Sequence, residues 1–84
     1  MRQVCGLDVH KDTIFACITD TSGVIFQEKF GTLTSELNRL ASDLEAHDVS
    51  LVGMESTSVY WRPVWKRLEG TCEQKLVNPY FIKH

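Results

Sequence analysis

Apolar and polar residues along the first third of the chain follow patterns that are typical of β-strands. Gln3–Val9 is apolar and nearly continuous, which predicts a central strand buried on both faces. Thr13–Thr19 is rich in β-branched and aromatic residues, and Val24–Phe30 alternates between two faces. The polar breaks His10–Asp12 and Asp20–Gly23 are too short for a parallel crossover. The three segments are therefore expected to form an antiparallel meander.

The pattern then changes to a helical period. Five apolar residues share one stripe with 3.6 residues per turn: Leu33, Leu37, Leu40, Ala41 and Leu44. Thr32 or Thr34 is placed to cap the first turn, and Glu36 suits the dipole there. This helix is expected to end near His47.

A strand, a helix and a short last strand complete the pattern. Val49–Glu55 is expected to be a buried strand. A second helix is expected over Ser58–Glu69, with one side formed by Val59, Trp61 or Arg62, Trp65 and Leu68. Pro63 is tolerated only in a first turn, which favours a start nearer Arg62.

Gly70 is expected to close the second helix, and Gln74–Val77 to form the last strand. The resulting order, β-β-β-α-β-α-β, predicts an α/β fold with the mixed sheet of the ribonuclease H-like class. Asn78 and Pro79 are a natural start for a further helix from Tyr80, which has only five residues in this chain. We therefore expect a fold truncated before its later helices.

Composition narrows the class of protein. The 84 residues allow one small domain or part of one, and 43% hydrophobic with 24% charged residues indicate a folded chain. No apolar run approaches the roughly 20 residues that span a bilayer, and no signal peptide is recognisable, so we expect a cytoplasmic protein. The three cysteines show no C-x-x-C spacing and are expected to be buried reduced thiols. Positive charge is concentrated after Trp61, with five basic and two acidic residues over 62–84. This excess alone does not distinguish a phosphate-binding surface from an ordinary solvated one.

Two carboxylates stand out, because each lies in an apolar strand. Asp8 interrupts Cys5–Val9, and Glu55 ends Leu51–Glu55. If these strands are parallel neighbours, both acids lie at the carboxyl edge of the sheet, where open α/β sheets place their sites. There they would repel each other unless a divalent cation lay between them. The chemistry implied is metal-assisted phosphoryl transfer.

Three ordered motifs, 6-GLDVHK-11, 54-MESTSVYW-61 and 76-LVNP-79, resemble the N-terminal part of the DEDD transposases of insertion sequences, relatives of the Piv invertase. The resemblance covers essentially all of residues 1–84 and implies the incomplete N-terminal part of a catalytic domain similar to the resolvase RuvC. It implies that Asp8 and Glu55 are the first two of four catalytic acids that bind Mg²⁺ or Mn²⁺. The other two acids are expected beyond His84.

The resemblance also implies a function and partners. The parent protein would cleave and join DNA during transposition, with a guide RNA as a further partner. The 84-residue segment alone is expected to be inactive and to bind metal weakly. An exposed sheet edge or the Trp65 face is expected to favour a homo-oligomer.

Other residues have a functional and a structural interpretation. His10, Lys11 and Thr57 could touch nucleic acid, although a solvated turn and helix capping explain them as well. The basic residues Arg62 and Lys66 are further candidates for such contacts. Three aromatic residues could stack on bases, but helical spacing favours packing: Tyr60, Trp61 and Trp65.

Two other classes of function stay open. Gly-x-Asp in a first strand also occurs in actin-like ATPases and sugar kinases, whose hairpin binds ATP phosphates. That loop usually needs Gly and Thr after the acid, whereas Val9 and His10 stand here. The third interpretation is a non-catalytic oligomerisation module with surface acids.

Overall fold

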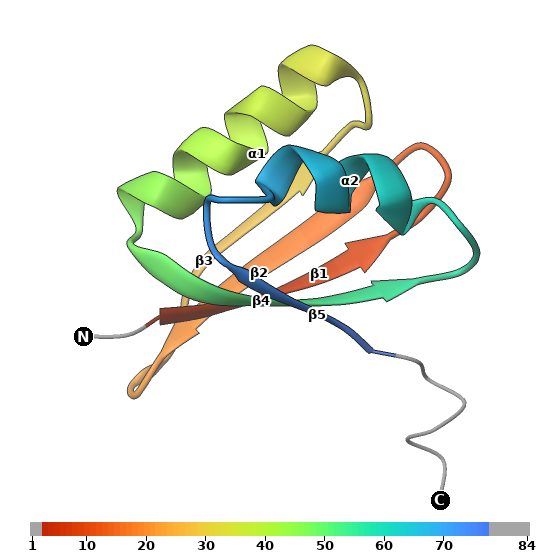
Figure 1. The fold of residues 1–84 in the computed structure, drawn as a ribbon. Coiled ribbons are helices and arrows are strands. Elements are labelled where there is room, and N and C mark those ends of the chain that lie inside the picture. The colour runs from red at the N-terminus through yellow and green to blue at the C-terminus, as the bar shows by residue number, and fades with distance from the viewer. Residues whose placement is uncertain (1–2, 78–84) are drawn as a thin grey trace, which may run out of the picture.

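The computed structural model describes residues 3–77, which form one five-stranded sheet with both helices on the same face (Figure 1). The strands are β1 (Gln3–Val9), β2 (Ile14–Asp20), β3 (Gly23–Phe30), β4 (Val49–Ser56) and β5 (Glu73–Leu76). The helices are α1 (Thr34–Ala46) and α2 (Trp61–Leu68). The element order predicted from the sequence is confirmed. The predicted helix from Tyr80 lies outside the described residues.

The sheet has the order β3-β2-β1-β4-β5, so β1 is central. β1, β2 and β3 pair antiparallel, as their short connections predict. β4 pairs parallel with β1, and β5 pairs parallel with β4. A helix makes each of the two crossovers, because parallel neighbours need a long connection.

The core lies between the sheet and the two helices. Its strand residues alternate along the chain, and from β1 they are Cys5, Leu7 and Val9. The prediction that this strand is buried on both faces is wrong, since Val4 is 41% exposed and Asp8 also faces solvent. The physical reason is that α1 and α2 cover one face and leave the other open (Figure 1). β4, predicted to be buried, is likewise buried on one face only.

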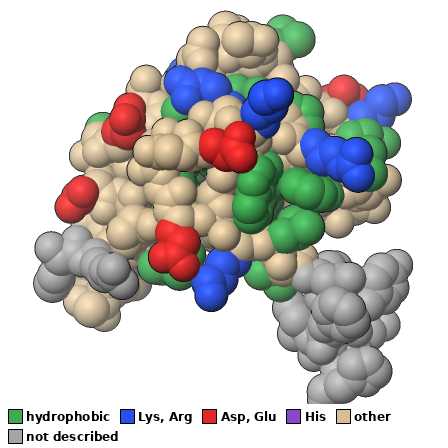
Figure 2. Space-filling model, viewed as in Figure 1, with side chains coloured by type: hydrophobic (Ala, Val, Ile, Leu, Met, Phe, Trp, Pro, Cys, Tyr) green, Lys and Arg blue, Asp and Glu red, His purple; other side chains and the backbone are tan. Residues whose placement is uncertain are grey.

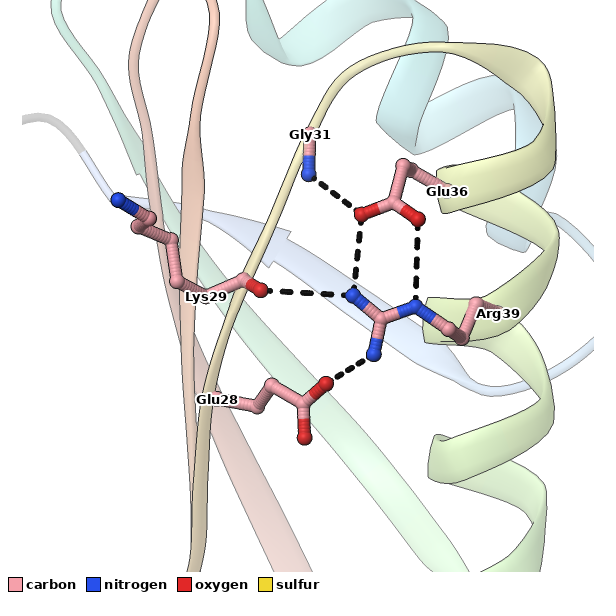
Figure 3. A network of polar contacts seen from close by, with 5 residues as sticks. All are labelled: Glu28, Lys29, Gly31, Glu36 and Arg39. Carbon is pink, nitrogen blue, oxygen red and sulfur yellow. Dashed lines mark hydrogen bonds and ion pairs between the residues drawn. The ribbon is translucent and has the colours of Figure 1, made fainter.

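The start of α1 differs from the prediction. Leu33 is the N-cap residue and makes no side-chain capping bond, so the expected caps at Thr32 and Thr34 are wrong. Glu36 instead reaches back and accepts a hydrogen bond of 3.0 Å from the backbone N–H of Gly31 (Figure 3). This bond ties the first turn of α1 to the end of β3.

Arg39 extends this contact into a clamp between α1 and β3. Its guanidinium pairs with Glu28 and with Glu36 (Figure 3). The guanidinium also lies 4.3 Å from the centre of the Phe30 ring. The ring is itself buried in the core. The clamp therefore joins a polar surface network to the packed layer beneath it.

The second helix is shorter than the range Ser58–Glu69 and starts next to Arg62, as the position of Pro63 favoured. It begins at Trp61, with Pro63 in its first turn as predicted, and Val59 lies outside it. Gly70 follows the helix end with a φ of +80°, a conformation that glycine adopts at little cost. Within residues 3–77 no helix is long and apolar enough to cross a membrane. Of the three cysteines only Cys5 is fully buried, which corrects the expectation for the other two.

Candidate functional site

The two acids singled out from the sequence lie side by side. Asp8 and Glu55 are Cα partners in the parallel pair β1–β4, and both side chains are exposed. Their chain neighbours Leu7 and Met54 are also register partners and point into the core. Because successive side chains in a strand point to opposite faces, both acids leave the sheet on its open face. Neighbouring strands are about 4.8 Å apart, so the carboxylates can reach one cation.

Alternation of the apolar residues fixes this placement. Val9 and Met54 are completely buried, and a one-residue slip of either strand would push an acid into the core. An unpaired carboxylate there would cost several kcal/mol. The register that buries the apolar side chains is therefore the register that brings the acids together.

His10 forms the first contact of the site. Its Nε2 atom lies 3.2 Å from Oδ2 of Asp8, whose side chain is 55% exposed. The ring also meets Phe15 edge-on, with 6.4 Å between ring centres. Phe15 is the register partner of Asp8 on β2 and is 49% exposed on the open face. Sequence reasoning missed Phe15, although the hairpin pattern could have placed it opposite Asp8.

Two glycines adjoin the acids on the same face. Gly6 and Gly53 are register partners, and each lies two residues before the acid of its strand. A Cβ added at Gly6 would meet no atom within 4 Å, and one added at Gly53 would lie 4.0 Å from Cγ2 of Val77. The open face therefore has a flat floor beside the acids, to which a ligand backbone can come close.

The turn after β4 crosses the carboxyl ends of β1 and β4. Its first bond is from the backbone N–H of Thr57 to the carbonyl oxygen of Val9, at 3.4 Å. The hydroxyl of Ser56 donates to the carbonyl of Ser58 at 2.9 Å. The turn is thus fixed to the strand that carries Asp8.

The remaining candidates lie at the same end of the molecule but do not all converge. Lys11 is exposed in the β1–β2 turn, and its neighbour His10 donates its backbone N–H to Thr13 at 2.8 Å. Arg62 lies over the Trp61 ring, 5.7 Å from its centre, at the start of α2. Lys66 is exposed one turn further along α2. Of the five residues proposed for nucleic-acid contact, only His10 touches one of the acids.

The tryptophans have the structural role that their spacing favoured. Trp61 and Trp65 pack edge to face, 5.8 Å apart, and both are partly buried against the core. Figure 2 shows apolar side chains gathered below α2, towards the ends of β4 and β5. Gln74 of β5 adds a hydrogen bond of 3.0 Å from its side-chain nitrogen to the Trp65 carbonyl.

The ligands available for a metal are these carboxylate oxygens. Among residues 3–77 no group of three or more His, Cys, Asp or Glu side chains is close enough to hold an ion. Hard cations such as Mg²⁺ prefer oxygen and keep several waters when few carboxylates bind them. An adjacent, exposed pair of acids fits such an ion.

Comparison with known proteins identifies the family. The family model for DEDD transposases of the IS110 type, described as transposase, matches residues 5–84 of the sequence. The chain belongs to this transposase family. No curated protein matches it. Its fold is the ribonuclease H-like fold of RuvC, as the sequence predicted.

Three solved structures show how widely this transposase fold is shared. Thermus thermophilus RuvC, in complex with a Holliday junction substrate, matches with a TM-score of 0.71 and 11% sequence identity, covering 99% of this chain and 68% of that one. The fowlpox virus Holliday junction resolvase matches with a TM-score of 0.65 and 18% sequence identity, covering 92% of this chain and 61% of that one. An exopolyphosphatase from Cytophaga hutchinsonii matches with a TM-score of 0.62 and 14% sequence identity, covering 93% of this chain and 35% of that one. At these identities the likeness shows the fold alone.

Proposed function

We propose that this chain is a segment of the catalytic domain of a transposase that cleaves and joins DNA with Mg²⁺ or Mn²⁺. The observation that carries the proposal is the pairing of Asp8 with Glu55 on the open face of the sheet. Membership of the transposase family and the likeness to two Holliday junction resolvases support it.

Asp8 and Glu55 would hold the cation, and each contributes a different geometry. Both acids are the second-to-last residue of their strand; Asp8 touches His10, whereas Glu55 has the longer side chain. Their oxygens would provide some of the ligands, and water and phosphate would provide the others. Such a cation would activate the attacking oxygen and stabilise the leaving oxygen.

Basic and polar residues at the same end would position the DNA backbone. His10 and Lys11 come from the β1–β2 turn and Thr57 from the turn after β4, while Arg62 and Lys66 come from α2. Such contacts supply affinity through phosphates and carry no sequence information. We keep a guide RNA and self-association as further proposals, the latter tested by light scattering of the purified chain.

The structure gives an argument against the ATPase alternative. A phosphate-binding hairpin needs free backbone N–H groups that face the ligand. Here the N–H of His10 is used in a bond to Thr13, and the turn contains no glycine. The turn between β1 and β2 therefore does not favour ATP binding.

Metal binding tests the proposal directly. We expect the chain to bind Mn²⁺ weakly, as measured by the loss of the free-ion signal in electron paramagnetic resonance. Asp8→Asn and Glu55→Gln should each abolish this binding. Glu73→Gln is the matched control, because Glu73 is an exposed strand carboxylate whose register partner is the apolar Leu51.

Activity is tested in the complete transposase. DNA cleavage should require Mg²⁺ or Mn²⁺ and should disappear in Asp8→Ala and Glu55→Ala, while circular dichroism shows an intact fold. Cleavage that survives either substitution would remove that residue from the mechanism.

A further inference from the structure

The turn between β4 and α2 presents two apolar side chains to solvent at the edge of the proposed DNA site. Val59 is 53% exposed and Tyr60 is 36% exposed. The aromatic residues that follow differ, because Trp61 and Trp65 are packed against the core. Core packing therefore explains the tryptophans and does not explain Val59 and Tyr60.

The backbone holds this pair in place. On one side the N–H of Thr57 donates to the carbonyl of Val9, and on the other the N–H of Arg62 donates to the carbonyl of Val59 at 3.1 Å. A turn that is already ordered loses little conformational entropy when a ligand binds it. The same bonds fix Val59 and Tyr60 relative to the strand ends that carry Asp8 and Glu55.

The charge beside the pair is complementary to nucleic acid. Over Trp61–Leu68 three residues are basic, Arg62, Lys66 and Arg67, and none is acidic. Figure 2 shows Lys and Arg side chains around the apolar patch at α2. A polyanion is attracted to such a surface, and an exposed aromatic side chain beside it can stack on the face of a base.

We propose that Tyr60, supported by Val59, stacks against an unstacked base of the DNA strand whose phosphate lies at Asp8 and Glu55. This inference rests on the proposed function, since it takes DNA as the ligand. Apolar and aromatic side chains that insert between bases weaken stacking and bend the duplex. Glu55 and Tyr60 are five residues apart, and the turn between them is bonded to Val9, which keeps the base contact near the proposed metal site.

The test uses a branched DNA that carries 2-aminopurine next to the branch-point base, with Ca²⁺ replacing Mg²⁺. Unstacking is easiest at a branch, and it raises the fluorescence of 2-aminopurine. We expect the wild-type chain to raise the fluorescence on binding. Tyr60→Ala should abolish the rise and weaken binding about tenfold, whereas Tyr60→Phe keeps the ring and should retain both.

Val24→Ala is the matched control for Val59→Ala. Val24 is 57% exposed and lies on β3 beside the β2–β3 turn, at the opposite end of the sheet. Only the change at Val59 should reduce the fluorescence rise, and thermal unfolding should show all variants folded.

The inference is overturned if the wild-type chain binds no branched DNA, if it binds without a fluorescence rise, or if Tyr60→Ala behaves as wild type. Failure of the metal-dependent function has a different signature. In that case the chain binds no Mn²⁺ but still raises the fluorescence through Tyr60.

Discussion

Asp8 on β1 and Glu55 on β4 are register partners in neighbouring parallel strands, and both point to the face of the sheet that the helices leave open. Two like charges in this arrangement repel each other and destabilise the fold. The core does not need either charge, because the preceding residues Leu7 and Met54 fill it from the other face of the sheet. A bound ligand of opposite charge would remove this repulsion, which is the physical basis for proposing a cation between the two acids.

This repulsion predicts that removing one charge stabilises the metal-free chain. Asp8→Asn should raise the free energy of unfolding by about 0.2–1 kcal/mol in the presence of EDTA, measured by urea denaturation. Added Mg²⁺ should stabilise the wild type and leave the variant unchanged. Glu73→Gln should show neither effect, and an Asp8→Asn chain less stable than wild type in EDTA would contradict the idea.

The Arg39 clamp predicts how stability depends on pH. Hydrogen bonds from Arg39, then from Gly31, lower the pKa of Glu36 below its ordinary value of 4.5. The stabilisation is therefore present above pH 4.5 and is lost as the pH falls through the lower, folded-state pKa. Arg39→Met should reduce this acid-side loss of stability, measured by urea denaturation at a series of pH values.

Arg67→Met is the control for the clamp. Arg67 is an exposed arginine whose side chain donates to the neutral Asn38 at 2.7 Å. Its removal should leave the acid-side pH dependence as in wild type. An equal change in both variants would show that net charge, and not the clamp, governs the effect.

Burial predicts an order of cysteine reactivity. Burial raises the pKa of Cys5 to about 12, and the side chain is only 3% exposed. Cys17 is partly exposed beside Gln27. Iodoacetamide at mildly alkaline pH should label Cys17 well before Cys5, as mass spectrometry of digests will show. In guanidinium the difference should vanish, and early labelling of Cys5 in the folded chain would contradict its burial.

The energetic cost of a left-handed backbone conformation can be measured separately from side-chain crowding at Gly70, just after α2. Gly70 has a φ of +80°, and a Cβ there would meet no atom within 4 Å. Gly70→Ala should therefore cost about 1–2 kcal/mol through the left-handed backbone alone. Gly6→Ala adds a methyl in equally open space without a positive φ, so it should cost little or nothing. Thermal unfolding measures both, and equal losses would count against the strain argument.

Local pattern was sufficient for much of the fold. Apolar runs, β-branched residues and, in Val24–Phe30, alternation placed the strands to within about one residue, and the leucine stripe placed α1. These predictions succeed because each depends on residues a few positions apart. The side-chain cap expected at the start of α1 was wrong, since Leu33 caps without a side-chain bond.

The sequence by itself determined the order of the elements, the two acids worth testing and the family motifs that contain them. Only the tertiary structure decided that the acids share one open face, that Phe15 and His10 flank Asp8, and that Tyr60 is exposed while Trp61 is packed. The physical reason is separation along the chain. Register, and the choice of the sheet face that both helices cover, depend on contacts between segments tens of residues apart, which no local period encodes.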